Sequence, residues 1–183
     1  MSRPDPNQPL YTALLQGSLR LSRQGDWWHN GKPFTNQKVA ELFHRSLAWD
    51  PSRSAFVIRL GQQQATFDCE DTAYFVLSLV TSCLPWQIAL NDGRLLALDP
   101  HSLRYGSEGQ FYCAVRAAVP DQGVEASAPL VLARFSRPAH QSLVEHAEDE
   151  RSLRVGDEVI TPLPVSAEPV LSASAATHLR TTK

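Results

Sequence analysis

The stretch that decides the fold is Gly25-Asp-Trp-Trp-His-Asn-Gly-Lys-Pro-Phe34, in which an Asn-Gly pair separates two short runs of aromatic and polar residues. Asn30-Gly31 is a strong hairpin signal, because a two-residue type I′ turn needs both of its residues at positive φ. Residues 27–29 enter the turn and Lys32 leaves it. The stretch therefore predicts a β-hairpin near the start of the chain.

A helix is expected directly after this hairpin. Apolar residues recur at helical spacing from Val39 to Ala48, and Thr35 or Asn36 can cap the first turn. Asp50 and the proline after it end the pattern.

Short strands and turns fill most of the remaining chain, with a second hairpin turn expected at residues 91–93. Two further helices are predicted, a short one over 9–15 and a longer one over 137–151. The expected strands are 19–21, 55–60, 65–69, 73–80, 86–90, 95–98, 111–118, 129–135 and 155–160.

This order of elements predicts an α+β fold with mainly antiparallel strands, built from two tandem sheet-plus-helix motifs and flanked by disordered tails. The expected boundaries are a tail over 1–8, an N-terminal half over 9–84, a C-terminal half over 85–160 and a tail over 161–183. Both tails are rich in proline and polar residues, which favours disorder.

Composition excludes several classes of function. The chain has 183 residues, 43% of them hydrophobic, and a formal net charge of −2, which argues against a nucleic-acid partner. Its first ten residues contain no apolar run, so we expect no secretory signal, and it has no uninterrupted apolar stretch of the length that a membrane span needs. Its three cysteines form no CxxC pair, which is typical of reduced thiols, and we expect a cytoplasmic protein.

Motifs for common chemistries are also missing. The sequence has no phosphate-binding loop, no dinucleotide fingerprint, no nucleophile elbow and no HExxH zinc motif. The six histidines show no spacing that would place two of them on one helix face. We therefore expect no cofactor, no metal site and no catalytic constellation.

The hairpin aromatics are the first candidate binding residues. Trp27 and Trp28 alternate across a strand, so one can lie in the core while the other lies on the surface. An exposed tryptophan beside His29 and Lys32 would suit a contact surface, because tryptophan contributes strongly to binding energy at interfaces. The alternative is that both rings only pack.

Glu70 and Asp71 are the second candidates, since they form the acidic pair between strongly apolar strands. One interpretation is a strand-end pair that binds an arginine such as Arg59. The other places Asp71 in the floor of a polar pocket, which would require a positioned partner.

Three functions follow as hypotheses. The first is a non-enzymatic module that binds a small ligand or a protein partner, with a regulatory or signalling role. The second is a small hydrolase- or isomerase-like enzyme using Asp71, Glu70 and His29, which needs these residues close to one reacting group. The third is a subunit of a larger assembly, so an oligomer is possible.

Several segments resemble, in order, the bacterial domain-of-unknown-function 1285 family. The stretch 25–34 and the helix start at 39–43 resemble the family's opening signature, and 69–74 and 133–144 resemble later segments. Asn30 stands where the family usually has glutamate, which marks a divergent member. The resemblance implies a two-part α+β fold with repeated motifs and a role in signalling or ligand sensing, with no established reaction.

Overall fold

The predicted hairpin forms around Asn30 and Gly31. In the computed structural model, which describes residues 8–119 and 128–165, β2 (Trp27–His29) turns into the antiparallel β3 (Lys32–Pro33). Asn30 has a φ of 50° and Gly31 a φ of 76°, so both adopt the left-handed backbone that a type I′ turn requires. The Asn30 side chain also accepts a hydrogen bond from the backbone N–H of Ser18 at 2.9 Å, which joins the turn to the residue just before β1 (Leu19–Leu21).

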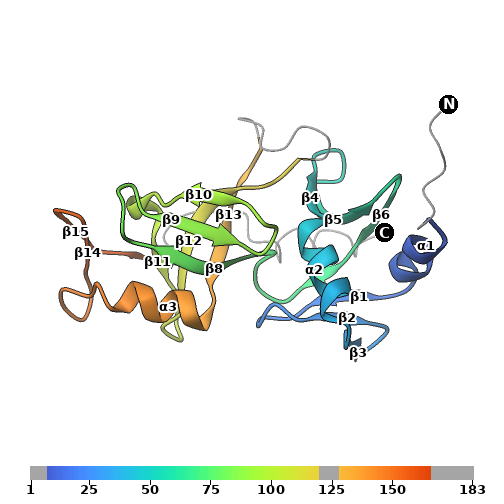
Figure 1. The fold of residues 1–183 in the computed structure, drawn as a ribbon, viewed down its shortest axis with the longest axis horizontal. Helices are drawn as coiled ribbons and strands as arrows, with labels where there is room; N and C mark the ends of the chain where they lie inside the picture. Colours follow the sequence, from blue (N-terminus) through green and yellow to red (C-terminus); the bar gives the residue numbers. More distant parts are fainter. Residues whose placement is uncertain (1–7, 120–127, 166–183) are drawn as a thin grey trace, which may run out of the picture. The chain divides into compact units, whose positions relative to one another are not determined.

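The described residues divide into two units, which Figure 1 colours along the chain. Unit 1 holds residues 8–73, 116–119 and 128–129, and unit 2 holds residues 74–115 and 130–165. The division thus falls after residue 73 rather than after 84, and a short later segment returns to unit 1, which sequence order alone did not indicate.

Unit 1 contains two small sheets. The first has the order β3-β2-β1-β7, in which β1 (Leu19–Leu21) pairs antiparallel with β2 and parallel with β7 (Asp68–Cys69). The second is the antiparallel sheet β4-β5-β6. Its strands are β4 (Leu47–Asp50), β5 (Ala55–Leu60) and β6 (Gln63–Thr66).

Two helices accompany these sheets. α1 (Gln8–Leu15) contacts β6, where Gln63 Nε2 donates to Thr12 Oγ1 at 2.7 Å. α2 (Gln37–Arg45) begins at the predicted cap, since the Asn36 side chain accepts from the backbone N–H of Lys38 at 3.0 Å.

Unit 2 is built on a seven-stranded sheet with the order β10-β9-β8-β13-β12-β11-β16. The pairs β8–β13 and β11–β16 are parallel, while β8–β9, β9–β10 and β11–β12 are antiparallel. The strands are β8 (Tyr74–Val80), β9 (Gln87–Leu90), β10 (Leu95–Ala97), β11 (Arg104–Tyr105), β12 (Phe111–Arg116), β13 (Leu130–Phe135) and β16 (Leu163–Pro164).

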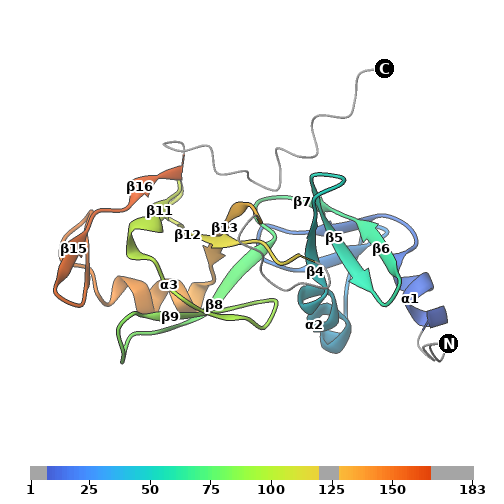
Figure 2. The same cartoon turned by 90° about the horizontal axis from the view of Figure 1, so that it is seen from above.

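One α-helix in the described part of unit 2 packs on this sheet. α3 (Arg137–Val144) lies against β8 and β13, as Figure 2 shows from above, and buries Ala139 and Leu143. A 3-10 turn, η1 (Pro100–Ser102), precedes β11. A separate hairpin of β14 (Leu153–Val155) and β15 (Glu158–Ile160) follows α3. The α+β class with mostly antiparallel strands is confirmed.

Several expected boundaries are wrong. The helical pattern predicted from Val39 to Ala48 ends at Arg45, because residues 47–50 pair with β5 as the strand β4. The helix predicted over 137–151 ends at Val144, because the acidic residues that follow oppose the helix dipole and Ala147 instead bridges to Leu153. The strand predicted over 155–160 is a hairpin that turns at Gly156, whose φ is 62°. The tail predicted from 161 contains β16, whereas 166–183 lie outside the described residues, as do 1–7.

Candidate functional site

The two adjacent tryptophans of the hairpin lie on opposite faces of the first sheet. Trp27 is only 1% exposed and packs edge-to-face on Phe43 of α2 and on Phe67, with ring centroids 5.3 and 4.9 Å apart. Its indole Nε1 donates to His44 Nδ1 at 3.3 Å. A fully buried ring with its polar atom satisfied is a structural element of the core, so this residue supplies packing and not a contact surface.

Trp28 lies on the other face, where it is half-buried. Its register partner on β1 is Arg20, and directly paired residues point to the same face of a sheet. The Arg20 guanidinium lies over the Trp28 ring at 4.7 Å from the centroid, a cation–π distance.

Glu70 completes this cluster from a distant part of the chain. Its Oε1 lies 2.9 Å from Arg20 Nη1, and its Oε2 accepts from the backbone N–H of Arg23 at 3.0 Å. The backbone N–H of Glu70 donates to the Leu21 carbonyl at 3.1 Å, which extends the parallel pairing of β1 with β7. We call Arg20, Trp28 and Glu70 the tryptophan face; each of its three side chains is partly open to solvent.

One polar atom of the tryptophan face is unsatisfied. The Nε1 of Trp28 is buried and has no hydrogen-bond partner among the described residues. A buried donor without an acceptor costs about 1–3 kcal/mol, so this N–H favours any rearrangement that brings an acceptor to it.

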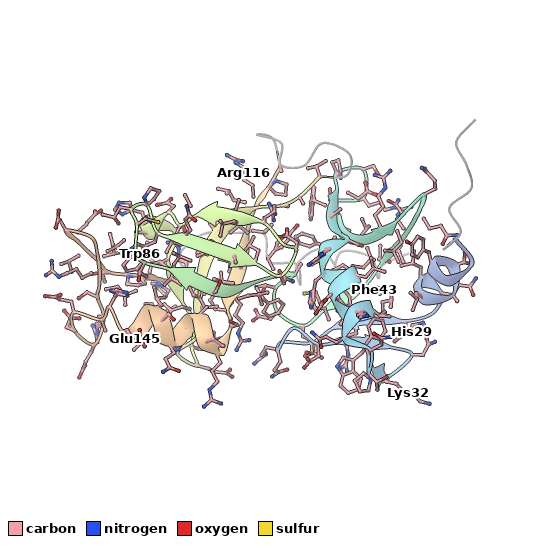
Figure 3. The ribbon with its side chains drawn as sticks, viewed as in Figure 1. His29, Lys32, Phe43, Trp86, Arg116 and Glu145 are labelled. Carbon is pink, nitrogen blue, oxygen red and sulfur yellow. The ribbon has the colours of Figure 1, made fainter. Side chains whose placement is uncertain are left out.

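His29 and Lys32 lie apart from the tryptophan face. They are register partners in the hairpin, and His29 also pairs with the buried Leu19, so both belong to the opposite face of the sheet. The His29 ring donates through Nε2 to the Gln16 carbonyl and contacts Phe34 edge-on. Lys32 is exposed. Figure 3 labels both residues at the hairpin, next to the helix that carries Phe43.

Burial makes the thiol next to the acidic pair inert. It raises the pKa of Cys69 to about 12, and the nearby carboxylates of Asp71 and Glu70 add to that rise. Asp71 itself is half-buried. A thiol that stays protonated at neutral pH offers no nucleophile here.

The residues of the enzymatic hypothesis do not share one reaction point. Glu70 binds Arg20 on the tryptophan face, whereas His29 belongs to the other face of the same sheet. Because the sheet separates them, they cannot act on one substrate atom, which general acid–base chemistry requires. Within residues 8–119 and 128–165, no group of three or more histidine, cysteine or acidic side chains could hold a metal ion.

Sequence reasoning missed Arg20 as a member of the site. Its alternation with Leu19 and Leu21 indicates that it points away from the core, which is a usable signal. Its placement opposite Trp28, however, depends on the register of two strands joined by a five-residue connection, and spacing alone does not fix that register.

The fold and this site together define a two-unit α+β protein whose first unit displays an aromatic hairpin. The sequence matches no family model and no curated protein. Its structure is similar to that of a DUF1285 family protein from Silicibacter pomeroyi DSS-3, at 14% identity over 82% of this chain and 83% of that chain, with a TM-score of 0.51. A DUF1285 family protein from Shewanella baltica OS155 matches 71% of this chain and 92% of its own at 14% identity, with a TM-score of 0.49.

The similarity to the first of these structures confirms, at the level of the fold, the resemblance that the hairpin and helix motifs predict. Among the described residues, no helix has the length and apolar character needed to cross a membrane.

Proposed function

We propose that this chain is a non-enzymatic binding module with a regulatory role, and that it recognises a protein partner through the tryptophan face. The observation that carries the proposal is Trp28, a half-buried ring whose indole N–H has no acceptor among the described residues. A change of the Trp28 rotamer would bring this buried donor to a backbone carbonyl of a partner. Tryptophan and arginine are the residues most enriched among those that dominate binding energy, and both are present.

The tryptophan face is held in place before any partner binds. Arg20 is fixed between the Trp28 ring at 4.7 Å and the Glu70 carboxylate at 2.9 Å, so it loses little side-chain freedom on binding. The guanidinium and the carboxylate also give the face one charge of each sign, which favours a partner with a complementary charge pair.

Recognition through side chains of the sheet face suits this unit better than the pairing of a partner's strand with the β3 edge. β3, the edge strand next to β2, has only two residues, and one of them is Pro33, which has no backbone N–H to donate. Recognition would therefore depend on side chains of the sheet face rather than on pairing with its edge.

Affinity capture from a lysate of the source cells, with the tagged full chain as bait, tests the proposal. We expect wild type to capture a partner whose captured amount, measured by quantitative mass spectrometry, falls at least tenfold with Trp28→Ala. Arg20→Lys keeps the charge but loses the planar stacking geometry, so the amount of captured partner should fall several-fold. Leu95→Ala removes a 60% exposed apolar side chain of unit 2 and serves as the control that retains the partner. Equal capture by wild type and Trp28→Ala would contradict the proposal.

A further inference from the structure

Unit 2 contains a hollow of about 820 Å³ at the end of the sheet where β11 and β16 lie. Its walls come from β11, β12, α3, the loop after α3 and the segment that contains β16. This volume is within the range of roughly 300–1,000 Å³ that small-molecule sites occupy. The hollow involves neither the tryptophan face nor any other residue of unit 1.

The hollow exists because α3 is too small to cover the sheet. An α-helix is about 10 Å wide and neighbouring strands lie about 4.8 Å apart, so one helix covers about two strands. α3 contacts β8 and β13, which leaves the β11–β16 end of the sheet open on this face.

A row of rings lines one side of the hollow. Tyr105 is the register partner of both Phe111 and Pro164, so these three side chains form one row across β12, β11 and β16. The His140 ring of α3 lies against Phe111, with centroids 5.4 Å apart, and its Nε2 donates to the Gly109 carbonyl at 3.3 Å. These contacts fix the orientation of two of the rings, and Tyr105 stays 45% exposed.

The opposite side contributes one unsatisfied hydroxyl. Ser152 lines the hollow and is only 6% exposed, yet its Oγ has no hydrogen-bond partner among the described residues. Its backbone is held by Asp149 Oδ1, which accepts from the N–H groups of Arg151 and Ser152 at 2.7 and 2.9 Å. A buried hydroxyl without a partner is costly, so a ligand group that bonds to it would gain affinity.

The charges around the hollow select the kind of ligand. Asp149, Glu150 and Arg151 all line it and are exposed, which gives two carboxylates against one guanidinium. The hydrogen bond from the Arg151 backbone holds the pKa of Asp149 below its ordinary value, so this carboxylate stays ionised at neutral pH. A cation is therefore favoured over an anion.

We infer that this hollow is a binding site for a small planar heteroaromatic cation, which stacks on the row of Phe111, Tyr105 and Pro164 and hydrogen-bonds to Ser152. Flat rings and Pro164 offer stacking surface, and Tyr105 adds a cation–π contact. The inference assigns unit 2 a ligand, whereas the proposed function concerns a protein partner of unit 1.

The probe for this site is 4-aminoquinoline, a planar cation at neutral pH, titrated into the isotope-labelled full chain and followed by amide NMR. We expect saturable shifts at the lining residues with a dissociation constant of about 1 mM or tighter. 1-Naphthoate has a similar shape but a negative charge, and should bind at least tenfold more weakly. A fitted dissociation constant above about 2 mM, shifts that map elsewhere, or equal binding of the anion would overturn the inference.

Three variants locate the probe. Ser152→Ala should weaken binding about three- to tenfold, as expected for one lost hydrogen bond, without lowering the thermal midpoint of the free protein. Val144→Trp, at a 43% exposed position of α3 that lines the hollow, should reduce binding below detection. Val159→Trp, at a 48% exposed position outside the hollow, is the matched control and should bind like wild type. Wild-type affinity in Ser152→Ala or Val144→Trp would contradict this placement.

Discussion

The two units bury their cores in different ways, and the difference explains where each leaves a feature exposed. Unit 1 packs aromatic rings edge-to-face, with Trp27 against Phe43 and Trp49 against Phe56 at 5.3 and 5.2 Å. Unit 2 covers a wide sheet with one short helix whose buried residues are Ala139 and Leu143. Small sheets leave an aromatic ring on an outer face, whereas a wide sheet under a short helix leaves a hollow. The two candidate sites are therefore of different kinds, a face and a pocket.

The largest expected effect concerns the three thiols, which report on both units. Burial raises the pKa of Cys69 in unit 1 and of Cys113 in unit 2 to about 12 each, while Cys83 is exposed. At pH 8 a thiol with such a pKa is ionised in roughly one molecule in 10⁴, so Cys83 should react with Ellman's reagent about three orders of magnitude faster than the other two.

The slow phases of the same reaction then compare the two units, because Cys69 belongs to unit 1 and Cys113 to unit 2. Variants that lack one buried cysteine, Cys69→Ala and Cys113→Ala, assign the phases. If all three thiols reacted at one rate, the burial of Cys69 and Cys113 would be contradicted.

Truncation of Trp27 should be the most destabilising single change in unit 1. Trp27→Ala removes a fully buried ring with two aromatic neighbours and should lower the free energy of unfolding by about 3–5 kcal/mol. Trp28→Ala, which alters a half-buried ring, is the matched control and should cost about 1 kcal/mol or less. Urea unfolding followed by circular dichroism measures both, and equal losses would remove the distinction between the core ring and the surface ring.

The corresponding change in unit 2 is Leu143→Ala. Leu143 is fully buried where α3 packs on the sheet, and its truncation should cost about 2–4 kcal/mol. The next residue, Val144, is 43% exposed, and Val144→Ala should stay within about 0.5 kcal/mol of wild type. A loss at Val144 as large as that at Leu143 would show that α3 packs in another orientation.

A smaller effect, in unit 1, depends on pH. The hydrogen bond from the Ser52 hydroxyl at 2.6 Å, helped by the Ser52 backbone N–H and by Arg53, holds the pKa of Asp50 below its ordinary value. A carboxylate with a lowered folded-state pKa contributes stability above its unfolded pKa, and this stability is lost as the pH falls through the folded pKa.

Asp50→Asn should therefore cost about 1–2 kcal/mol near pH 7 and lose less stability than wild type on acidification. Unfolding curves at neutral pH and at about pH 3 give the change in the free energy of unfolding with pH for wild type and for Asp50→Asn. Identical pH dependence in the two proteins would show that Asp50 makes no such contribution.

Local features of the fold could be predicted from the sequence, and non-local features could not. The turn at Asn30-Gly31 and the cap at Asn36 depend on residues within a few positions, so their chemistry is readable in the chain. The parallel pairing of β1 with β7 joins residues almost fifty positions apart, and no spacing indicates it.

The candidate site shows the same limit. Alternation predicts that one hairpin tryptophan is buried and the other is not, but only the three-dimensional register places Arg20 over Trp28 and Glu70 beside Arg20. Nothing in the sequence around Ser152 predicts its role, because its unsatisfied hydroxyl lines a hollow that residues from distant parts of the chain form.

The most direct test of the account is the dissociation constant of the captured partner, measured by calorimetry against wild type and the Trp28→Ala variant. The account predicts that the dissociation constant rises at least tenfold while the free energy of unfolding changes by about 1 kcal/mol or less, because Trp28 binds and Trp27 holds the core. An unchanged dissociation constant in a folded Trp28→Ala protein would contradict it.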